Sequence, residues 1–511
     1  MLLLLLLLHL SFGEEYFSIQ LSNNSTLIET FAKEHGLKHV RSVAGFEIFK
    51  NEGKTKRIVI EGLYKDIQRK HTKKEYHKLR DIDPLYMYQW HLHDNLFSVD
   101  CTEASGKGVN IAIVDDGIQH KHPDISNNYS PTLSWDFNDN DADPAPSYDD
   151  GHGTCCAGVA AAGRNNICGR GVAYEASIVG IRLIGKGVYD WQEAEALMHH
   201  NDKIRIYSNS WGPNDDGKRL EGPGPVTLEA LKRGFESGKS IFVWAGGNGK
   251  QQQDNSNYDG YANSPYTIAI GAIDYTGHQS SYSEPGANLF AVTPSSGSGK
   301  GIVTSDLMGP EGYSEGSCTY NFGGTSSSAP LAAGIIALLL QKRPELTTRD
   351  VMHIIANTGK KHTHEMGFGL LKVPLLLQST ATHVLVPPFV KHQQILYFTN
   401  KVIPKGSNFL IQPIITDFRM SNVEQVLVTV TITHGCRGQV NIRLESPVSE
   451  SILAENRKDC ASGTFTWTFT SVHHWGESVK MGDTWNFKVK DDTYNGYRGT
   501  LDKVIIEWWG N

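Results

Sequence analysis

Long apolar segments are nearly absent from this sequence. Beyond the leucine-rich start, no stretch approaches the roughly 20 apolar residues that a membrane-spanning helix needs, so we predict no integral membrane segment and a soluble mature protein. An excess of positive charge is also absent, because 48 Lys and Arg face 55 Asp and Glu, a formal net charge of −7. This balance argues against nucleic-acid binding and fits a cationic peptide partner. At 511 residues, the chain exceeds one typical domain.

The amino terminus has the features of a secretory signal. Residues 1–13 are a leucine run followed by small residues, and two glutamates come next, which predicts a signal peptide cleaved near Gly13. Glycosylation sequons begin at Asn23, Asn24 and Asn128, as is common in secreted proteins. We therefore expect the protein in the secretory pathway, either secreted or held in secretory vesicles.

Three glycine-flanked segments carry an aspartate, a histidine and a serine in that order: Asp115, His152 and Ser326. A serine hydroxyl is a poor nucleophile near neutral pH, so an imidazole must take its proton and a carboxylate must hold that imidazole in one tautomer. We assign these roles to Ser326, His152 and Asp115. The order matches subtilisin rather than chymotrypsin or the α/β-hydrolases, which favours a parallel α/β sheet. The three segments predict a serine protease.

The flanking residues place each group at the end of a predicted element. An apolar run over residues 110–114 predicts a buried parallel strand, with the aspartate at its carboxyl end. Ser326 opens a helix predicted over residues 326–341 and gains from its amino-terminal field. A second buried strand over residues 241–245 leads to Asn248, a candidate donor to an oxyanion. Each signal alone is also typical of a turn, a hairpin or a helix cap, and only their common order favours a catalytic site.

The carboxyl-terminal part has a different pattern. A helix is predicted over residues 347–357, and from residue 385 short alternating strands predict an all-β sandwich. The strands are predicted over residues 425–433, 440–445, 465–469, 485–490 and 504–509. No catalytic constellation occurs among them, so this region is expected to brace the rest of the protein.

These motifs resemble those of the subtilisin-like proprotein convertases, or kexins. The matching stretches are Asp115-Asp116-Gly117-Ile118, His152-Gly153-Thr154, Tyr207 to Pro213, Phe242 to Ala245 and Gly324 to Gly334. The resemblance implies a subtilisin-like parallel sheet with flanking helices over residues 75–375 and a P domain over residues 385–511. It also implies an inhibitory or chaperone prodomain of α/β type over residues 14–74.

The end of the expected prodomain is basic and polar over residues 68–75, which is typical of an exposed segment. The family's preference for paired basic residues predicts self-cleavage after Lys74. Lys70 and Arg80 are alternative positions for the cut, and a merely solvated basic linker is the alternative interpretation.

The resemblance further implies cleavage of precursor polypeptides after Lys-Arg or Arg-Arg pairs. An arginine guanidinium prefers two-pronged carboxylate partners, so the substrate cleft should present fixed acids. The acidic positions that align with the family's substrate-binding residues are Asp116, Asp149, Asp150, Asp190, Glu193, Asp215, Glu221 and Asp259, with Asp215 and Asp259 at the base of the primary pocket. The segment Ser210, Trp211, Gly212 and Pro213 aligns with the edge along which an extended peptide adds as a strand. Solvated surface charges are the alternative for any single carboxylate.

Clusters of acidic residues also suggest metal binding, and hard oxygen ligands suit Ca²⁺. The resemblance implies three calcium sites, formed by Asp136, Asp141 and Asp143; by Asp83, Asp124 and Asn165; and by Asp215, Asp254 and Glu284. A disordered acidic loop is the alternative for the first set.

Seven cysteines in a secreted chain invite pairing. The resemblance implies the bonds Cys168–Cys318 and Cys436–Cys460. Cys101, Cys155 and Cys156 remain, and their state stays open. Thiol sensitivity near the histidine is one possibility for Cys156, and a buried inert thiol is the other.

The residues and the resemblance together predict a calcium-dependent, monomeric serine endoprotease whose partners are dibasic precursors and its own prodomain. An alternative is a catalytically weak relative that binds basic peptides as a chaperone or decoy. A broad-specificity secreted subtilisin would not need so many aligned carboxylates. The intact set of Ser326, His152, Asp115 and Asn248 favours the enzyme.

Overall fold

A seven-stranded sheet forms the centre of the larger part of the chain in a computed structural model. Its strands are β4 (Asn110–Asp115), β5 (Trp135–Asp136), β6 (Ser177–Arg182), β7 (Ile206–Asn209), β8 (Ile241–Ala245), β9 (Thr267–Ile273) and β10 (Leu289–Pro294). They lie in the order β10-β9-β8-β7-β4-β6-β5, and every neighbouring pair is parallel. The strand residues are mostly buried, as expected for apolar strands with helices on both faces. The predicted α/β class is confirmed.

The structure describes residues 83–100, 103–148, 150–493 and 495–511. Nearer the amino terminus it describes the strands β1 (Tyr16–Ile19), β2 (Leu37–Val43) and β3 (Phe46–Asn51). Residues 1–81 and 82–511 form two compact units. In the first unit the three strands make an antiparallel sheet in the order β1-β3-β2. The predicted signal peptide, the predicted cut after Lys74, and the side chains of Asp149 and Cys101 lie outside the described residues.

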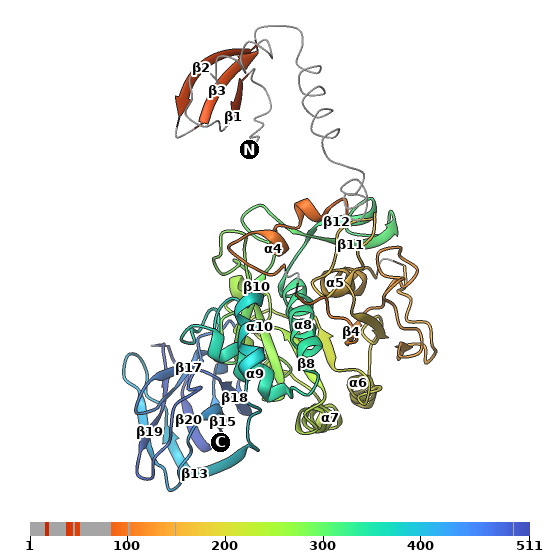
Figure 1. Ribbon diagram of the computed structural model, residues 1–511. Coiled ribbons are helices and arrows are strands. Elements are labelled where there is room, and N and C mark those ends of the chain that lie inside the picture. Colours follow the sequence, from red (N-terminus) through yellow and green to blue (C-terminus); the bar gives the residue numbers. More distant parts are fainter. Residues whose placement is uncertain are drawn as a thin grey trace. The chain divides into compact units, whose positions relative to one another are not determined.

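The helices of this part flank the parallel sheet or pack on other helices beside it. They are α4 (Trp90–His93), α5 (His152–Ala161), α6 (Asp190–Met198), α7 (Pro225–Glu236), α8 (Thr325–Lys342), α9 (Thr348–Thr358) and α10 (Val373–Thr382). The long helix α8 is buried along almost its whole length and packs against α5 and strands β7 to β10 (Figure 1). Its bounds confirm the predicted helix over residues 326–341. The side chain of Thr347 caps α9 together with Asp350, which confirms the helix predicted there.

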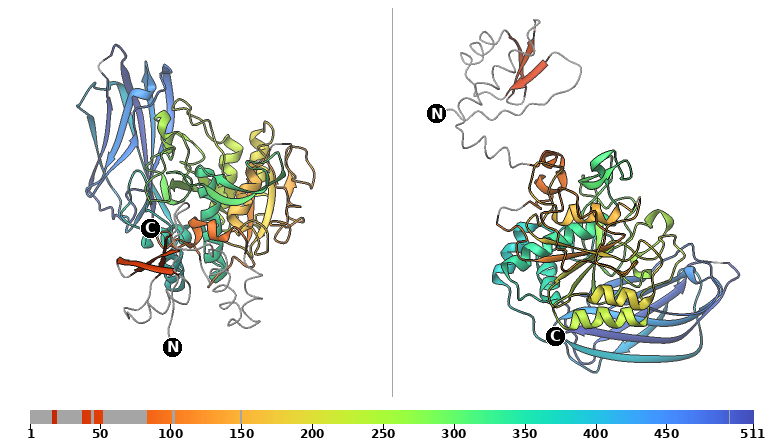
Figure 2. Two further views of the ribbon diagram at one scale, coloured as in Figure 1. Left: turned by 90° about the horizontal axis from the view of Figure 1, so that it is seen from above. Right: turned by 90° about the vertical axis from the view of Figure 1, so that its right-hand side faces the viewer.

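A β-sandwich follows the α/β part and packs against one side of it (Figure 2). One of its sheets has the order β13-β20-β15-β18 and the other β14-β19-β16-β17. The strands are β13 (Val390–Val402), β14 (Leu410–Ile415), β15 (Val423–His434), β16 (Val440–Glu445), β17 (Glu450–Ala454), β18 (Gly463–Ser471), β19 (Thr484–Asp491) and β20 (Gly499–Gly510). The five predicted strands are confirmed, whereas β13, β14 and β17 were not anticipated.

Two further features bear on the site. The antiparallel strands β11 (Ile302–Gly309) and β12 (Gly316–Phe322) lead into α8. Disulfides join Cys168 to Cys318 and Cys436 to Cys460, as the resemblance implied. Within the part of the chain that the structure describes, no helix combines the length and apolar character needed to cross a bilayer.

Candidate active site

Asp115 and His152 form a hydrogen bond at the carboxyl edge of the parallel sheet. Asp115 is the last residue of β4, and His152 is the first residue of α5. His152 Nδ1 lies 2.8 Å from Asp115 Oδ1, with the carboxylate side chain 1% exposed and the imidazole 25% exposed. Since Nδ1–H donates to the carboxylate, Nε2 remains as the acceptor that a serine hydroxyl requires.

The carboxylate also determines how readily His152 holds a proton. Burial alone would lower the pKa of His152, but the charge and hydrogen bond of Asp115, together with Cys156, raise that pKa well above its ordinary value. An imidazolium beside this carboxylate is therefore stabilised, which is the state formed when the imidazole accepts the proton of a serine.

Asp116 anchors the helix that carries His152. Its Oδ1 accepts the N–H of Gly153 at 2.7 Å, and its Oδ2 accepts the N–H of His152 at 3.1 Å. A carboxylate on the free N–H groups of a first helical turn stabilises that turn. Burial and the neighbouring Asp115 raise the pKa of Asp116 to about 7. Asp116 therefore positions the imidazole.

Ser326 lies where α8 begins, beside the first turn of α5. Two residues before it stands Gly324, whose φ of +72° falls in the region that favours glycine. The Ser326 carbonyl accepts the hydroxyl of Ser210 at 3.0 Å. Cys156 Sγ lies 3.5 Å from that carbonyl and 3.8 Å from His152 Nδ1. The fold thus brings the predicted serine next to the helix that carries the predicted base.

Asn248 is fixed in an orientation that suits an oxyanion donor. Its Oδ1 accepts both the N–H and the hydroxyl of Thr325, at 2.8 and 3.0 Å, and its own N–H donates to Asp215 Oδ2 at 2.7 Å. Thr325 directly precedes Ser326. Nδ2 makes no hydrogen bond within the described residues, so it is the free end of an amide held beside the serine. Such a preorganised donor stabilises charge that develops in a transition state.

The predicted edge segment continues directly from β7. Its Trp211 indole N–H donates to the Val114 carbonyl at 3.0 Å, and the Trp211 carbonyl accepts the indole N–H of Trp244 at 2.7 Å. Gly212 faces Asp259, because a Cβ at this position would lie 2.7 Å from Asp259 Oδ2. Glycine is therefore required where the edge segment passes the pocket.

Four carboxylates line one small pocket at the end of this segment: Asp215, Asp254, Asp259 and Glu284. Asp259 Oδ1 accepts the N–H of Tyr261 at 2.7 Å, so one oxygen is anchored. Burial raises the pKa of Asp259 to about 7 and also raises the pKa of Asp215 and Glu284. The pocket therefore favours a cation that would compensate this concentrated negative charge.

The remaining predicted substrate acids have partners within the protein. Both oxygens of Asp190 accept N–H groups of the first turn of α7, from Val226 and Thr227 at 2.9 Å, so this carboxylate caps a helix. Glu193 Oε2 accepts the hydroxyl of Tyr261 at 2.8 Å. Tyr261 was not anticipated from the sequence, although its place two residues after Asp259 was a usable signal.

Glu221 lies beside the pocket and forms an ion pair with an arginine. It forms a parallel β-bridge with Asp259, and Arg219 Nη1 donates to Glu221 Oε1 at 3.0 Å. Both side chains are about half exposed, so this ion pair contributes little to stability. A substrate cation can therefore compete with Arg219 for Glu221.

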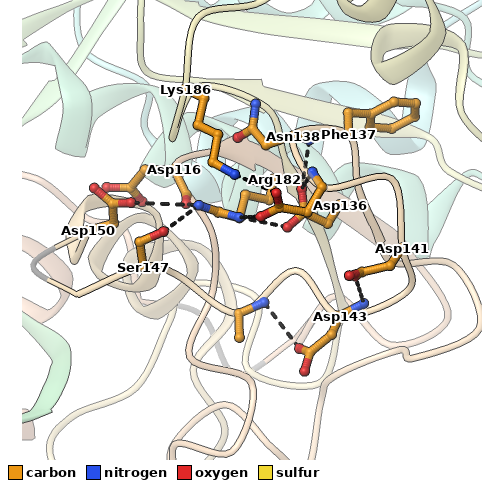
Figure 3. Close-up of polar contacts among 12 residues, drawn as sticks. Asp116, Asp136, Phe137, Asn138, Asp141, Asp143, Ser147, Asp150, Arg182 and Lys186 are labelled. Carbon is orange, nitrogen blue, oxygen red and sulfur yellow. Dashed lines mark hydrogen bonds and ion pairs between the residues drawn. The ribbon is translucent and has the colours of Figure 1, made fainter.

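A buried arginine, Arg182, lies among several of the predicted acidic residues (Figure 3). Arg182, the last residue of β6, donates Nη1 to Asp136 Oδ2 at 2.7 Å and to Asp139 Oδ2 at 2.8 Å. Its Nε donates to the Asp116 carbonyl at 3.1 Å, and Asp150 Oδ2 lies 4.0 Å from its Nη2. Arg182 therefore neutralises part of the negative charge of these aspartates. Its role was not anticipated from the sequence.

Arg182 occupies part of the first predicted calcium site. The structure does not bring the three carboxylates of this site together around one point. The carboxylate of Asp136 is occupied by Arg182, Asp141 Oδ1 accepts the N–H of Asp143 at 2.8 Å, and Asp143 contacts His120. In the described part of the chain, the ligand atoms of Asp136, Asp141 and Asp143 do not all lie within 4.8 Å of one another. Arg182 supplies positive charge at one end of this set, and a calcium site at Asp136, Asp141 and Asp143 stays a prediction from the resemblance.

The second set does come together. The N–H of Asn165 donates to Asp83 Oδ1 at 2.6 Å, and Asn165 Nδ2 donates to Asp124 Oδ1 at 2.9 Å. Both carboxylates are buried, and burial raises the pKa of Asp83 and that of Asp124, the latter to about 7. Neither forms an ion pair within the described residues. Two buried, uncompensated carboxylates beside an amide are a donor set that fits Ca²⁺.

The third set, Asp215, Asp254 and Glu284, lines the primary pocket. All three side chains surround Gly249, where a Cβ would lie 2.8 Å from Glu284 Oε1, 2.7 Å from the Asp254 Cβ and 3.0 Å from the Asp215 Cβ. In the described structure their ligand atoms do not all lie within 4.8 Å of one another. These donors also fit a hard cation. Asp254 has a second partner, Arg457 of the β-sandwich.

Cys155 and Cys156 are unpaired and buried. Burial raises the pKa of the Cys156 thiol to about 11 and also raises the pKa of the Cys155 thiol. A buried thiol that stays protonated is a poor nucleophile, which agrees with the inert alternative.

The fold and the order of Asp115, His152 and Ser326 define a subtilisin-type serine peptidase site. Residues 106–369 match the subtilase family, and residues 423–507 match the proprotein convertase P-domain. The chain is 41% identical over 442 residues to proprotein convertase subtilisin/kexin type 7 of Mus musculus, covering 78% of this chain and 57% of that protein. It is 32% identical over 550 residues to furin of Homo sapiens, covering 96% and 68% respectively.

Kexin of Saccharomyces cerevisiae is 36% identical over 534 residues, covering 96% of this chain and 63% of that protein. A serine protease of Aeromonas sobria has the same fold, with a TM-score of 0.76 at 22% sequence identity over 84% of this chain and 96% of that one. The chain belongs to the subtilase family and, within it, to the proprotein convertases of the furin and kexin type. It spans about three fifths of the length of the type 7 and furin-1 relatives.

Proposed function

We propose that the protein is a calcium-dependent endoprotease of the secretory pathway that cleaves precursors after Lys-Arg or Arg-Arg pairs. The observation that carries this proposal is the pocket of four carboxylates at the end of the edge segment, next to the helix of Ser326. A guanidinium forms charge-assisted hydrogen bonds with such acids that are worth about 1.5–3 kcal/mol each.

The catalytic steps follow from the contacts around His152. Nε2 takes the proton of the Ser326 hydroxyl as the serine oxygen attacks the carbonyl carbon of the second basic residue of the pair. The free amide of Asn248 donates to the oxyanion, and Asp115 stabilises the imidazolium. The imidazolium then protonates the leaving amine. Water, deprotonated by the same imidazole, releases the acyl group from the serine.

Substrate preference tests the pocket directly. In Asp259→Asn we expect kcat/KM for substrates with arginine before the cut to fall by about 30- to 4,000-fold, because one partner of a buried charge pair is lost at about 2–5 kcal/mol. The isosteric amide can keep the Oδ1 contact to Tyr261. The measurement is a profile of purified variants against a peptide library that varies this residue.

The matched control is Glu229→Gln, which removes a surface carboxylate from α7 that is 47% exposed. It should leave the profile unchanged. A wild-type enzyme that cleaves after leucine as well as after arginine would refute the proposed specificity, and equal losses for all residues in Asp259→Asn would refute the role of this carboxylate.

Calcium would be held by Asp83, Asp124 and Asn165 and by Asp215, Asp254 and Glu284, and it would supply positive charge that compensates these buried acids. Removing it should lower the thermal midpoint, since a site saturated at 100 times its Kd contributes about 2.7 kcal/mol of stability. We expect Asp124→Asn to reduce the stabilisation that calcium gives in a thermal unfolding scan with and without EGTA. The exposed Asp417→Asn should not.

Magnesium should not replace calcium, because it demands tighter octahedral geometry. Thermal midpoints that are identical with calcium and with EGTA would contradict calcium binding at both sites. An unaltered response in Asp124→Asn would contradict the site at Asp124.

A further inference from the structure

A buried arginine from the P domain reaches the primary pocket. The side chain of Arg457 is 2% exposed, and its Nη2 lies 2.9 Å from Asp254 Oδ1. The same nitrogen donates to the carbonyl of Arg219 at 2.6 Å. The guanidinium carbon lies 3.9 Å from the centre of the Tyr258 ring. A buried arginine needs contacts that compensate its desolvation, and these three do so for Nη2 and for the face of the guanidinium, while Nε is buried without a hydrogen-bond partner.

These contacts hold the two segments that carry the pocket acids. Arg219 lies four residues after Asp215, and Tyr258 directly precedes Asp259. Arg219 and Tyr258 line the same pocket as both acids. One guanidinium thus ties together two loops whose separation sets the separation of the carboxylates.

The P-domain segment around Arg457 is itself firmly held. The disulfide between Cys436 and Cys460 closes it. The N–H of Arg457 donates to the Gly438 carbonyl at 2.8 Å, and the N–H of Gly438 donates to the Asp459 carbonyl at 2.8 Å. A Cβ on Gly438 would lie 2.2 Å from that carbonyl oxygen, so this close approach requires glycine. The sandwich therefore presents the guanidinium from a fixed backbone.

Neighbouring contacts fix the same pocket segment. Tyr258 donates its hydroxyl to the Glu455 carbonyl at 3.2 Å, so the P domain contacts both its ring and its hydroxyl. Glu455 Oε2 accepts Asn255 Nδ2 at 2.9 Å and lies 2.7 Å from His364 Nε2.

The charge of Arg457 also suits this position. Among the described residues it is the only basic side chain that forms an ion pair with any of the four pocket carboxylates. It contacts Asp254 and leaves Asp215 and Asp259 without a basic partner. A fixed cation there reduces repulsion among the acids without occupying the two that would meet a substrate guanidinium.

We propose that Arg457 is a positioning residue for primary specificity, through which the P domain sets the spacing of Asp215 and Asp259. The P domain then completes the specificity pocket instead of only bracing the peptidase. This inference rests on the proposed preference for arginine before the scissile bond.

The test compares Arg457→Gln with the conservative Arg457→Lys in the full-length protein. For Arg457→Gln we expect KM for an Arg-Arg peptide, and the Kd of the fluorescent amidine 4-aminobenzamidine, to rise about tenfold because the acids are misplaced. The kcat should stay within about threefold, since Arg457 contacts neither Asp115 nor His152. Lysine restores the charge beside Asp254 but not the flat stacking on Tyr258, so Arg457→Lys should recover part of the affinity.

The matched control is Arg443→Gln, which breaks a P-domain ion pair with Glu450 and should leave KM and probe affinity unchanged. Unchanged KM and Kd in Arg457→Gln, or equal losses in Arg443→Gln, would overturn the proposal. If Arg457→Gln fails to fold, Arg457→Lys is the variant that tests the proposal. Wild-type KM and Kd in Arg457→Lys would show that the planar contacts of the guanidinium do not position the pocket. A wild-type enzyme without a preference for arginine would refute the proposed function and this inference with it.

Discussion

Ser326→Ala is expected to lower kcat for an Arg-Arg peptide by about 10⁴- to 10⁶-fold, because it removes the nucleophile of a group of residues that act as a unit. The residual rate comes from substrate binding and from the oxyanion donor Asn248, which the substitution leaves in place. The measurement is steady-state hydrolysis of a fluorogenic peptide by purified enzyme.

The same variant tests maturation. If the proposed self-cleavage after Lys74 is correct, Ser326→Ala should keep its prodomain attached, as mass spectrometry of the secreted protein will show. Removal of the prodomain at the normal position would indicate that another protease matures the chain. It would leave the role of Ser326 in peptide cleavage untouched.

Ser327→Ala is the matched control for this experiment. Its hydroxyl lies 2.7 Å from the hydroxyl of Ser295 and 3.2 Å from the Gly324 carbonyl, so it is engaged within the core beside the active serine. We expect a cost of about 1 kcal/mol in stability and little change in kcat. Comparable losses of kcat in both variants would contradict the assignment of Ser326 as nucleophile.

The catalytic groups could be predicted because their signals are local. An apolar run, a glycine turn and a functional residue stand next to one another in the sequence at Asp115, Asn248 and Ser326. The strand over residues 241–245 and the helix beginning near residue 326 are fully buried elements with unmistakable apolar patterns. Here the local pattern and the final fold agree.

The strands that could not be predicted lie at sheet edges. In the orders β13-β20-β15-β18 and β14-β19-β16-β17, the three unanticipated strands β13, β14 and β17 each have a neighbour on one side only. β13 is exposed along most of its length, and β14 contains Pro413, which is tolerated at an edge. An edge strand buries less surface, so its sequence carries a weaker alternation of apolar and polar residues.

Contacts between residues far apart in the sequence could not be predicted either. Arg457 and Arg219 make a contact across 238 residues, and Arg182 and Asp136 pair across 46. The sequence predicts that a carboxylate is present but not whether the fold gives it an internal partner. For this reason the sequence did not indicate that Asp190 caps a helix or that Asp136 pairs with Arg182.

Asp115→Asn is expected to lower kcat by about 10³- to 10⁴-fold without unfolding the protein. Asp115 Oδ1 accepts both His152 Nδ1–H and the N–H of Asp116, while its Oδ2 is buried without a hydrogen-bond partner. An asparagine that keeps its oxygen at the Oδ1 position loses the charge that stabilises the imidazolium and buries an unpaired NH₂ group. The flipped amide instead presents donors to His152 and enforces the wrong tautomer.

The pH dependence of this variant distinguishes an electrostatic role from a merely structural one. The base must be neutral, so kcat/KM rises as pH increases through the pKa of His152, which Asp115 raises well above its ordinary value. Without that charge, burial dominates and the pKa falls, so the acid limb of the kcat/KM profile should move to lower pH even though the rate is smaller. The surface variant Asp417→Asn should change neither the rate nor the profile. An acid limb that stays in place in Asp115→Asn would show that this carboxylate does not set the proton affinity of the catalytic imidazole.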